Sequence, residues 1–306
     1  MDILAIGEPL MELSESTEGQ YVSGFGGDTS NFIIAASRQG ASTAYQTAVG
    51  SDTFGSKFLK LWRQENVNTD LVRIDPEHHT GLYFISYGEQ GHEFTYHREG
   101  SAASYMSGEF INEKVLNDFR YIHVSGISQA ISNSACDAIY KAILIAQKNG
   151  TVVTYDPNLR LKLWPLERAK AIIHNTLQHV DIFLPSLDDV THLTGLDNPE
   201  KIVDYYLDMG LKMVVLKLGR EGCIVATPEK KTHIPGFIVD SLDATGAGDT
   251  FDGAFVAQLS KGKSPKTAAQ YANAAAALST QGIGAVTPIP SIKQVEQFLL
   301  EQSIKF

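Results

Sequence analysis

Short apolar segments alternate with segments of helical periodicity along this chain, and this alternation restricts its fold more than any other feature. The first apolar run, Ile3–Ile6, is closed by a glycine, which is typical of a strand buried on both faces. Similar runs follow, and helical patterns lie between them at 132–149 and 166–179. This order predicts βαβ units, and therefore an α/β domain with a doubly wound, mainly parallel sheet flanked by helices. The later runs are at 121–124, 152–155, 182–184 and 214–216.

Two aromatic-rich segments interrupt this rhythm. Residues 81–87 and 93–98 are separated by the turn-like sequence Gly88-Glu89-Gln90-Gly91, which predicts an antiparallel hairpin. We expect this hairpin to join a segment near the N-terminus in a small sheet that projects from the main domain and covers a site. The expected organisation is one domain over residues 1–306, with a β-sheet lid built from insertions at about 9–25 and 81–99.

Charge and cysteine content disfavour several classes of function. The formal net charge is -10, which argues against a surface for nucleic acid or anionic membranes. The two cysteines are far apart and lack CxxC spacing, so neither a disulfide framework nor a thiolate metal site is expected. No apolar run of about 18 residues and no signal-like start occur, so we expect a cytoplasmic protein without a membrane partner.

The strongest chemical signal is the segment Asp243-Ala244-Thr245-Gly246-Ala247-Gly248-Asp249, which precedes a helical pattern. Its glycines let the backbone approach a ligand closely, and a helix beginning there would direct unpaired amides and its positive dipole end at an anion. Asp249 would lie in the first turn, where a carboxylate can accept a proton from an attacking hydroxyl. The alternative is an ordinary loop that ends in a favoured helix-start residue.

This segment is similar to the C-terminal signature of the ribokinase-like (PfkB) carbohydrate kinases. Residues 24–31, Gly-Phe-Gly-Gly-Asp-Thr-Ser-Asn, resemble the sugar-binding signature near the N-terminus of that family. The resemblance implies a ribokinase-like fold with Asp249 as the catalytic base. It also implies an anion hole for the γ-phosphate of ATP, formed by the amides of Gly246, Ala247 and Gly248. The sugar would be bound by Gly27, Asp28 and Asn31.

Residues 216–222, Leu-Lys-Leu-Gly-Arg-Glu-Gly, resemble the nucleotide-binding strand and turn of the same family. The resemblance implies that Gly219 and Gly222 admit the ATP phosphates and that Lys217 contacts the nucleotide, although the family often has Thr there. Asn273 falls where family members line the adenine pocket, and the alternative for it is a solvated helix residue.

Ser186 and Asp189 occupy positions where many family members carry the motif Asn-x-x-Glu, which is tied to Mg²⁺ and phosphate binding. The resemblance implies a nucleotide contact for Ser186 and a water-mediated contact with Mg²⁺ for Asp189. The alternative is a capping box at a helix start.

Residues 94–102, Phe-Thr-Tyr-His-Arg-Glu-Gly-Ser-Ala, are similar to the Tyr-x-Arg-x-Gly-Ser-Ala segment of the 2-keto-3-deoxygluconate kinases within this family. Tyr96 and Arg98 would share one face of a strand, and a guanidinium is rarely buried without an anionic partner. The resemblance implies that Tyr83, Tyr96 and Arg98 hold the acid end of the substrate, with Arg160 near the substrate or the phosphate.

The implied activity is ATP-dependent phosphorylation of the terminal C6 hydroxyl of a sugar acid, 2-keto-3-deoxy-D-gluconate. Mg²⁺ is the expected metal ion, a monovalent cation such as K⁺ is a further candidate, and a homo-oligomer through the lid sheet is expected. A fructokinase or another neutral-sugar kinase is the alternative, and the Tyr96-x-Arg98 pair is the feature that discriminates against it. Neutral-sugar members more often follow the first strand with an Asp for sugar hydroxyls, and here Glu12 is only its nearest counterpart. A sugar sensor without turnover is disfavoured, because simple binding does not require a proton acceptor at Asp249.

Overall fold

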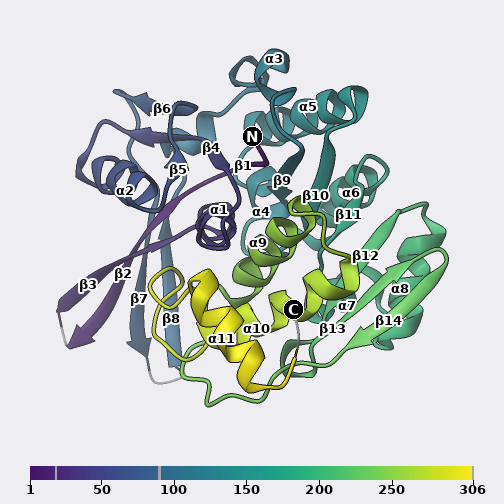
Figure 1. Ribbon diagram of the computed structural model, residues 1–306. Coiled ribbons are helices and arrows are strands. Elements are labelled where there is room, and N and C mark those ends of the chain that lie inside the picture. The colour runs from purple at the N-terminus through teal and green to yellow at the C-terminus, as the bar shows by residue number, and fades with distance from the viewer. Residues whose placement is uncertain (18, 89–90, 305–306) are drawn as a thin grey trace.

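A large, mainly parallel sheet forms the centre of the molecule in this computed structural model, which describes residues 1–17, 19–88 and 91–304 (Figure 1). Its strands are β1 (Ile3–Ile6), β4 (Thr43–Gly50), β5 (Val67–Asn68), β6 (Val72–Asp75), β9 (Tyr121–Ser125), β10 (Val152–Asp156), β11 (Ile182–Phe183), β12 (Met213–Lys217), β13 (Cys223–Thr227) and β14 (Lys230–Ile234). Their order is β14-β13-β12-β11-β10-β9-β1-β4-β5, and β6 pairs with β4. Only the pairs β12–β13 and β13–β14 are antiparallel among the described strands of this sheet.

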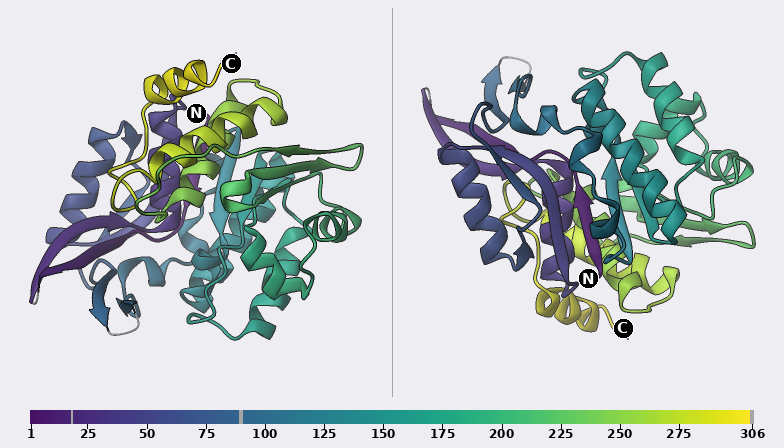
Figure 2. Two further views of the ribbon diagram at one scale, coloured as in Figure 1. Left: turned by 90° about the horizontal axis from the view of Figure 1, so that it is seen from below. Right: turned by 90° about the horizontal axis from the view of Figure 1, so that it is seen from above.

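Helices cover both faces of this sheet (Figures 1 and 2). One face packs against α1 (Asp28–Arg38), α2 (Thr53–Gln64), α9 (Ala247–Ser260), α10 (Pro265–Ser279) and α11 (Ile292–Glu301). The other packs against η1 (Ala102–Tyr105), η2 (Gly108–Phe110), α3 (Glu113–Leu116), α4 (Gly126–Ala130), α5 (Asn133–Asn149), α6 (Leu166–Leu177), α7 (Leu187–Thr194) and α8 (Pro199–Asp208). A short turn of 3₁₀ helix, η3 (Gly219–Glu221), follows β12.

The position of β1 between two layers of helices explains why its sequence is apolar throughout. Ile3 and Ala5 pack into the core with α1 and α9, whereas Leu4 and Ile6 pack into the core on the opposite face. Because successive side chains of a strand point to opposite faces, a strand covered on both sides must be apolar at every position. The predicted doubly wound α/β fold is confirmed. The expected helix 166–179 is slightly shorter, since α6 ends at Leu177.

A second, smaller sheet extends away from the main body (Figures 1 and 2). It consists of β2 (Leu10–Thr17), β3 (Gln20–Gly26), β7 (Leu82–Gly88) and β8 (Gly91–His97), in the order β3-β2-β7-β8. The predicted hairpin corresponds to the antiparallel pair β7 and β8, and its expected turn residues Glu89 and Gln90 lie outside the described residues. That this second sheet acts as a lid stays a prediction.

The parallel strands present their carboxyl ends at one edge of the main sheet. Glu8 follows β1, Asp156 ends β10, Ser186 follows β11 and Lys217 ends β12. Open α/β sheets bind ligands at this edge, so these side chains mark the region to search for a site. Within the described part of the chain, no helix combines the length and apolarity that a membrane span requires.

Candidate active site

Helix α9 begins in a tightly fixed loop. Gly246 is its N-cap with φ +72°, and a Cβ at this position would lie 3.0 Å from the Ala285 side chain. The Asp243 carboxylate accepts hydrogen bonds from the amides of Thr245 (2.9 Å) and Gly284 (2.8 Å). The Ala247 amide donates to the Ala244 carbonyl at 3.2 Å, so this predicted anion-hole group is used within the loop. The Thr250 amide donates to the Gly246 carbonyl at 2.9 Å, whereas the amides of Gly248 and Asp249 lie in the first turn, where helical amides lack an intrahelical acceptor and favour an anion.

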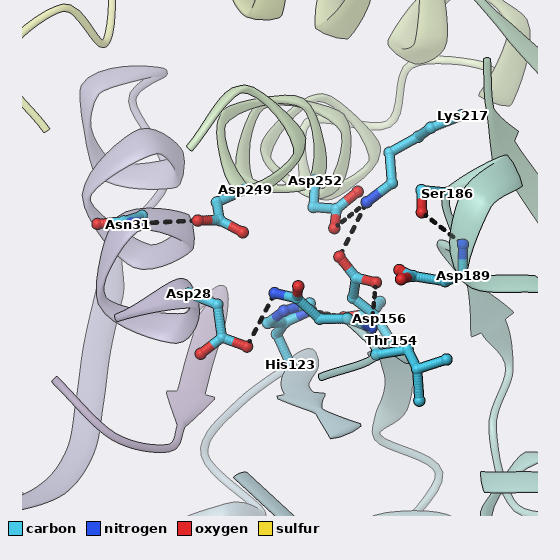
Figure 3. A network of polar contacts seen from close by, with 12 residues as sticks. Asp28, Asn31, His123, Thr154, Asp156, Ser186, Asp189, Lys217, Asp249 and Asp252 are labelled. Carbon is cyan, nitrogen blue, oxygen red and sulfur yellow. Dashed lines mark hydrogen bonds and ion pairs between the residues drawn. The ribbon is translucent and has the colours of Figure 1, made fainter. Parts of the chain in front are cut away.

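Asp249 lies in the first turn of α9, as the sequence predicts. Asn31 on α1 donates from Nδ2 to Asp249 Oδ2 at 2.8 Å (Figure 3). Burial raises the pKa of Asp249 to about 7; the neighbouring Asp28 charge adds to this rise, and the hydrogen bond from Asn31 opposes it. A carboxylate with a pKa near neutrality is suited to act as a general base.

The N-terminus of α1 forms the adjoining side of the site. Gly27, its N-cap, has φ +95°, and a Cβ there would collide with the carbonyl of Glu8. Asp28 accepts from the Thr29 amide at 2.8 Å. The Oδ1 atom of Asn31 is buried and has no hydrogen-bond partner among the described residues. A buried acceptor of this kind is costly unless a ligand satisfies it.

Arg98 is buried, and its anionic partner is Glu8. Ser101 Oγ also donates to Glu8, at 3.1 Å. Burial raises the pKa of Glu8, and the positive charge of Arg98 opposes this rise. The guanidinium of Arg98, which was predicted to bind the substrate, therefore already pairs with a carboxylate of the protein. Its Nε has no acceptor within the described residues. Sequence reasoning missed this role of Glu8, for which the signal was a carboxylate directly after a fully buried strand.

The other residues predicted to hold the substrate acid lie in different surroundings. Tyr83 is buried and donates from its hydroxyl to the Glu12 carboxylate. Tyr96 is 39% exposed, and its ring centroid lies 5.7 Å from the guanidinium carbon of Arg98. Arg160 is exposed and donates to the Leu159 carbonyl at 2.9 Å. Tyr83 and Tyr96 are neighbours, with ring centroids 5.7 Å apart.

Lys217 lies on the opposite side of α9 from Asn31 (Figure 3). Its ammonium nitrogen is 2.9 Å from Asp156 Oδ2 and 2.8 Å from Asp252 Oδ2. A Cβ built on Gly248 would lie 3.6 Å from the same nitrogen, so the buried cation stands beside the first turn of α9. The predicted contact of Lys217 with the nucleotide stays a prediction.

Burial favours the neutral form of both acidic partners of Lys217. For Asp156 burial is opposed by the adjacent Lys217 charge together with hydrogen bonds from Asp252, Lys217 and the Asn158 amide, which hold the pKa below its ordinary value. For Asp252 burial prevails, helped by the charge of Asp156, and its pKa is well above the ordinary value. Neither Asp156 nor Asp252 was predicted from the sequence as a site residue. The available signals were the position of Asp156 at the end of a buried strand and that of Asp252 one turn after Asp249.

Ser186 is the N-cap of α7, and its side chain accepts from the Asp189 amide at 3.2 Å. Ser186 therefore caps the helix, as the alternative interpretation of this residue predicts. Burial and the charge of Asp156 raise the pKa of Asp189 to about 6. Among the described residues, no group of three or more His, Cys, Asp and Glu side chains is arranged to hold a metal ion. A Mg²⁺ ion would therefore need phosphate oxygens and water for most of its coordination.

Three residues predicted to contact the nucleotide lie around η3 and α10. Gly219 has φ +60° and open space where a Cβ would stand, whereas a Cβ on Gly222 would collide with the Ile234 carbonyl. Gly222 is therefore required by packing. Asn273 is buried and donates to the carbonyls of Ile234 (3.2 Å) and Pro235 (3.1 Å), so the alternative of a solvated helix residue is wrong.

A carboxyl group with a raised pKa, a helix N-terminus and a largely buried lysine thus lie together at the carboxyl edge of a doubly wound sheet. This combination suits a phosphotransferase, because such enzymes act by positioning groups around a phosphoryl group and by stabilising its charge.

Comparison with known proteins agrees with this class. The family model described as pfkB family carbohydrate kinase matches residues 2–292. The chain is 33% identical to the 2-dehydro-3-deoxygluconokinase of Thermoproteus tenax, over 98% of this chain and 94% of the relative. It is 30% identical to the probable fructokinase-5 of Arabidopsis thaliana, over 98% of both chains. A putative Ribokinase II of E. coli in complex with ATP and Mg²⁺ superposes with a TM-score of 0.90 at 28% identity, covering 98% of this chain and 99% of the other.

The chain therefore belongs to the pfkB family of carbohydrate kinases. Its fold is ribokinase-like, as the sequence resemblance implies, and the enzyme is a sugar kinase.

Proposed function

We propose that this kinase transfers the γ-phosphoryl group of ATP to the terminal C6 hydroxyl of 2-keto-3-deoxy-D-gluconate, forming 2-keto-3-deoxy-6-phosphogluconate. One observation carries the proposal: Asp249, with its pKa near 7, lies half-buried in the first turn of α9 and accepts a hydrogen bond from Asn31. The choice of a sugar acid is supported by the similarity to the 2-dehydro-3-deoxygluconokinase of Thermoproteus tenax. ATP as the donor is supported by the E. coli relative that holds ATP and Mg²⁺.

In this reaction Asp249 accepts the proton of the attacking hydroxyl while the new oxygen–phosphorus bond forms and the bond to the ADP oxygen breaks. The amides of Gly246, Ala247 and Gly248 were predicted to stabilise the negative charge on the transferred group. In the structure the Ala247 amide is directed to Ala244, so Gly248 and the rest of the first turn carry this role. Lys217, beside Gly248, adds a positive charge.

We assign the remaining nucleotide contacts to residues near the carboxyl edge of the sheet. We assign the ATP phosphates to the open space at Gly219 and to Ser186, with Asn273 supporting the adenine side through the loop after β14. Mg²⁺, when bound to the triphosphate, supplies charge neutralisation, and Asp189 would face its water shell. Extensively dialysed protein should contain little metal and should be inactive until Mg²⁺ or Mn²⁺ is added; stoichiometric zinc in active enzyme would contradict this assignment.

Sugar hydroxyls are assigned to the α1 side of the site, with the unpartnered Oδ1 of Asn31 as an acceptor and Gly27 and Asp28 beside it. The acid end of the substrate is assigned to Tyr96, Tyr83 and the Nε of Arg98, and Arg160 supplies a further, exposed guanidinium. We further propose that the second sheet closes over the substrate.

A second candidate is phosphorylation of a neutral sugar such as fructose. The observation in its favour is the ion pair of Arg98 with Glu8, because a guanidinium that is already neutralised attracts a substrate carboxylate less strongly. Glu12 also offers a carboxylate to hydroxyl groups next to Tyr83. The similarity to a plant fructokinase agrees with this alternative.

The test is an ADP-release screen with 2-keto-3-deoxygluconate, 2-keto-3-deoxygalactonate, fructose and ribose as acceptors. We expect the highest kcat/KM with 2-keto-3-deoxygluconate. A clear preference for fructose would move the chain to the second candidate, and ADP release that no sugar stimulates would remove both. The variant Asp249→Asn serves as the control for contaminating kinases.

The second sheet also supports a proposal about assembly. On β3, Tyr21 and Val22 are 44% and 61% exposed, which leaves apolar surface at the edge of the second sheet. We propose that two copies associate through this sheet. Sedimentation should detect a dimer, and Val22→Lys should shift it toward the monomer.

A further inference from the structure

A series of buried hydrogen bonds connects Lys217 with Asp28 and passes through both oxygens of Asp156. Lys217 Nζ lies 2.9 Å from Asp156 Oδ2. The other oxygen, Oδ1, accepts the backbone N–H of Asn158 at 2.9 Å, and Asn158 Nδ2 donates to Asp28 Oδ2 at 3.2 Å. Asp156, Asn158 and Asp28 are all buried, so water does not compete strongly for these bonds.

Asn158 has an unusual backbone, with φ +34°. Residues other than glycine rarely adopt a positive φ, although Asn tolerates it better than most, and such strain persists only where the surroundings enforce it. Here the Asp156 carboxylate captures the Asn158 amide and thereby fixes the turn after β10. This backbone turn directs the Asn158 side chain to Asp28.

The other end of the series lies beside the phosphate-binding start of α9. Lys217 is held between Asp156 and Asp252, close to Gly248 (Figure 3). Because Asp156 is the partner of this pair that holds the negative charge more strongly, its bond to the ammonium is charge-assisted. The Asp156 carboxylate therefore contacts Lys217, on the side proposed for the ATP phosphates, and the Asn158 amide, on the side proposed for the sugar.

We propose that Asp156 is a positioning residue that couples the two substrate sites: its Oδ2 fixes Lys217 for the nucleotide phosphates, and its Oδ1 fixes Asn158, which holds Asp28 for the sugar. The inference rests on the proposed function. Contiguous hydrogen-bond networks of this kind can carry coupling between sites. Because coupling between two binding events is reciprocal, nucleotide and sugar should each tighten the binding of the other by the same factor.

The experiment measures the Kd of AMP-PNP with Mg²⁺ by calorimetry, alone and with saturating 2-keto-3-deoxygluconate, and then with fructose. In the wild type the sugar that is phosphorylated should lower this Kd by about fivefold or more. Asp156→Asn keeps the shape, but its new NH₂ group must face either Lys217 or the Asn158 amide, so one link is lost. The ratio of the two Kd values should then fall toward one.

Asn158→Gly isolates the sugar side. Glycine accepts the positive φ without strain but lacks the amide that reaches Asp28. This variant should also lose the coupling ratio, whereas its Kd for AMP-PNP alone should stay within about twofold of the wild-type value, since Lys217 keeps both carboxylates. It also keeps the proposal testable if Asp156→Asn does not fold.

The matched control is Asp181→Asn. Asp181 likewise bridges a lysine, Lys212 (2.6 Å), and a backbone amide of β10, that of Val153 (2.9 Å), but at the opposite end of the strand. Its coupling ratio should equal that of the wild type. A wild-type ratio of one, or a ratio preserved in both Asp156→Asn and Asn158→Gly, would overturn the proposed coupling. Sugar phosphorylation measured on the same preparations separates this result from failure of the proposed function, which is indicated only if the wild type phosphorylates no sugar.

Discussion

The two sides of α9 place the same kind of residue in different surroundings. Asp249, which is half-buried, and Asp252, which is fully buried, stand about one turn apart on this helix. Asp249 faces the neutral amide of Asn31, whereas Asp252 faces the ammonium of Lys217, which it shares with Asp156. Burial raises the pKa of both carboxyl groups, so the difference lies in the partner: Asn31 leaves Asp249 able to accept a proton, whereas Asp252 helps to hold Lys217. On the proposed function, the side of α9 that faces Asn31 is the sugar side and is suited to proton transfer, whereas the side that faces Lys217 is the phosphate side and holds a fixed positive charge.

The largest effect should come from Asp249→Asn. The amide is nearly isosteric but cannot accept the proton of the hydroxyl, so kcat should fall by roughly 10² to 10⁴ while AMP-PNP binding persists. Steady-state kinetics and calorimetry measure the two quantities. Asp252→Asn is the comparison variant and should retain far more activity. Equal losses in the two variants would abolish the distinction between the two sides.

Replacing the cation tests the phosphate side. Lys217→Met leaves Asp156 and Asp252 buried without their cation, which should lower the free energy of unfolding by about 3 to 5 kcal/mol. Urea denaturation gives this quantity. Lys212→Met is the matched control, because the Lys212 side chain is 78% exposed and its pairing with Asp181 should contribute no more than about 1 kcal/mol. A Lys217 variant as stable as the control would mean that the buried charges are not held as described.

Selectivity tests the charge balance of the sugar side. Arg98→Leu should reduce kcat/KM for 2-keto-3-deoxygluconate more than for fructose, by about 1.5 to 3 kcal/mol, since only the acid loses a charged partner. Tyr96→Phe should change the ratio less.

Because Arg98 also pairs with Glu8, its removal damages the site for every sugar, and only the ratio of the two kcat/KM values reports acid recognition. Glu8→Gln should shift this ratio toward the acid, because it leaves the guanidinium uncompensated. Proportional losses on both substrates after Arg98→Leu would assign Arg98 to support of the second sheet alone.

The smallest effect concerns pH. Because burial raises the pKa of Asp249 to about 7, the carboxylate that accepts the proton is depleted as the pH falls below that value. The kcat/KM should therefore fall about tenfold per unit below pH 7 and level off above it. The residual activity of Asp249→Asn should lack this slope. A wild-type profile that stays flat down to pH 5 would mean that Asp249 is ionised throughout and that its pKa is not raised.

The sequence alone determined the fold class and the local geometry of the main motif. The apolar run Ile3–Ile6 predicted a strand buried on both faces, and residues 243–249 predicted a glycine loop that leads into a helix with Asp249 in its first turn. Both are local properties, because the alternation of side chains every two residues shows which faces of a strand are buried, and capping and glycine residues mark where a helix begins.

The tertiary structure alone decided which charged groups meet. Glu8 and Arg98 are 90 residues apart, and Lys217 is 61 residues from Asp156, so no local pattern links them. The sequence indicated that a buried guanidinium needs an anion, but a substrate carboxylate and the carboxylate of Glu8 satisfy that need equally well in a linear chain. The choice depends on which strand ends lie side by side, since the strength and the protonation of a buried charge are set by the distance to its partners and by the exclusion of water around them.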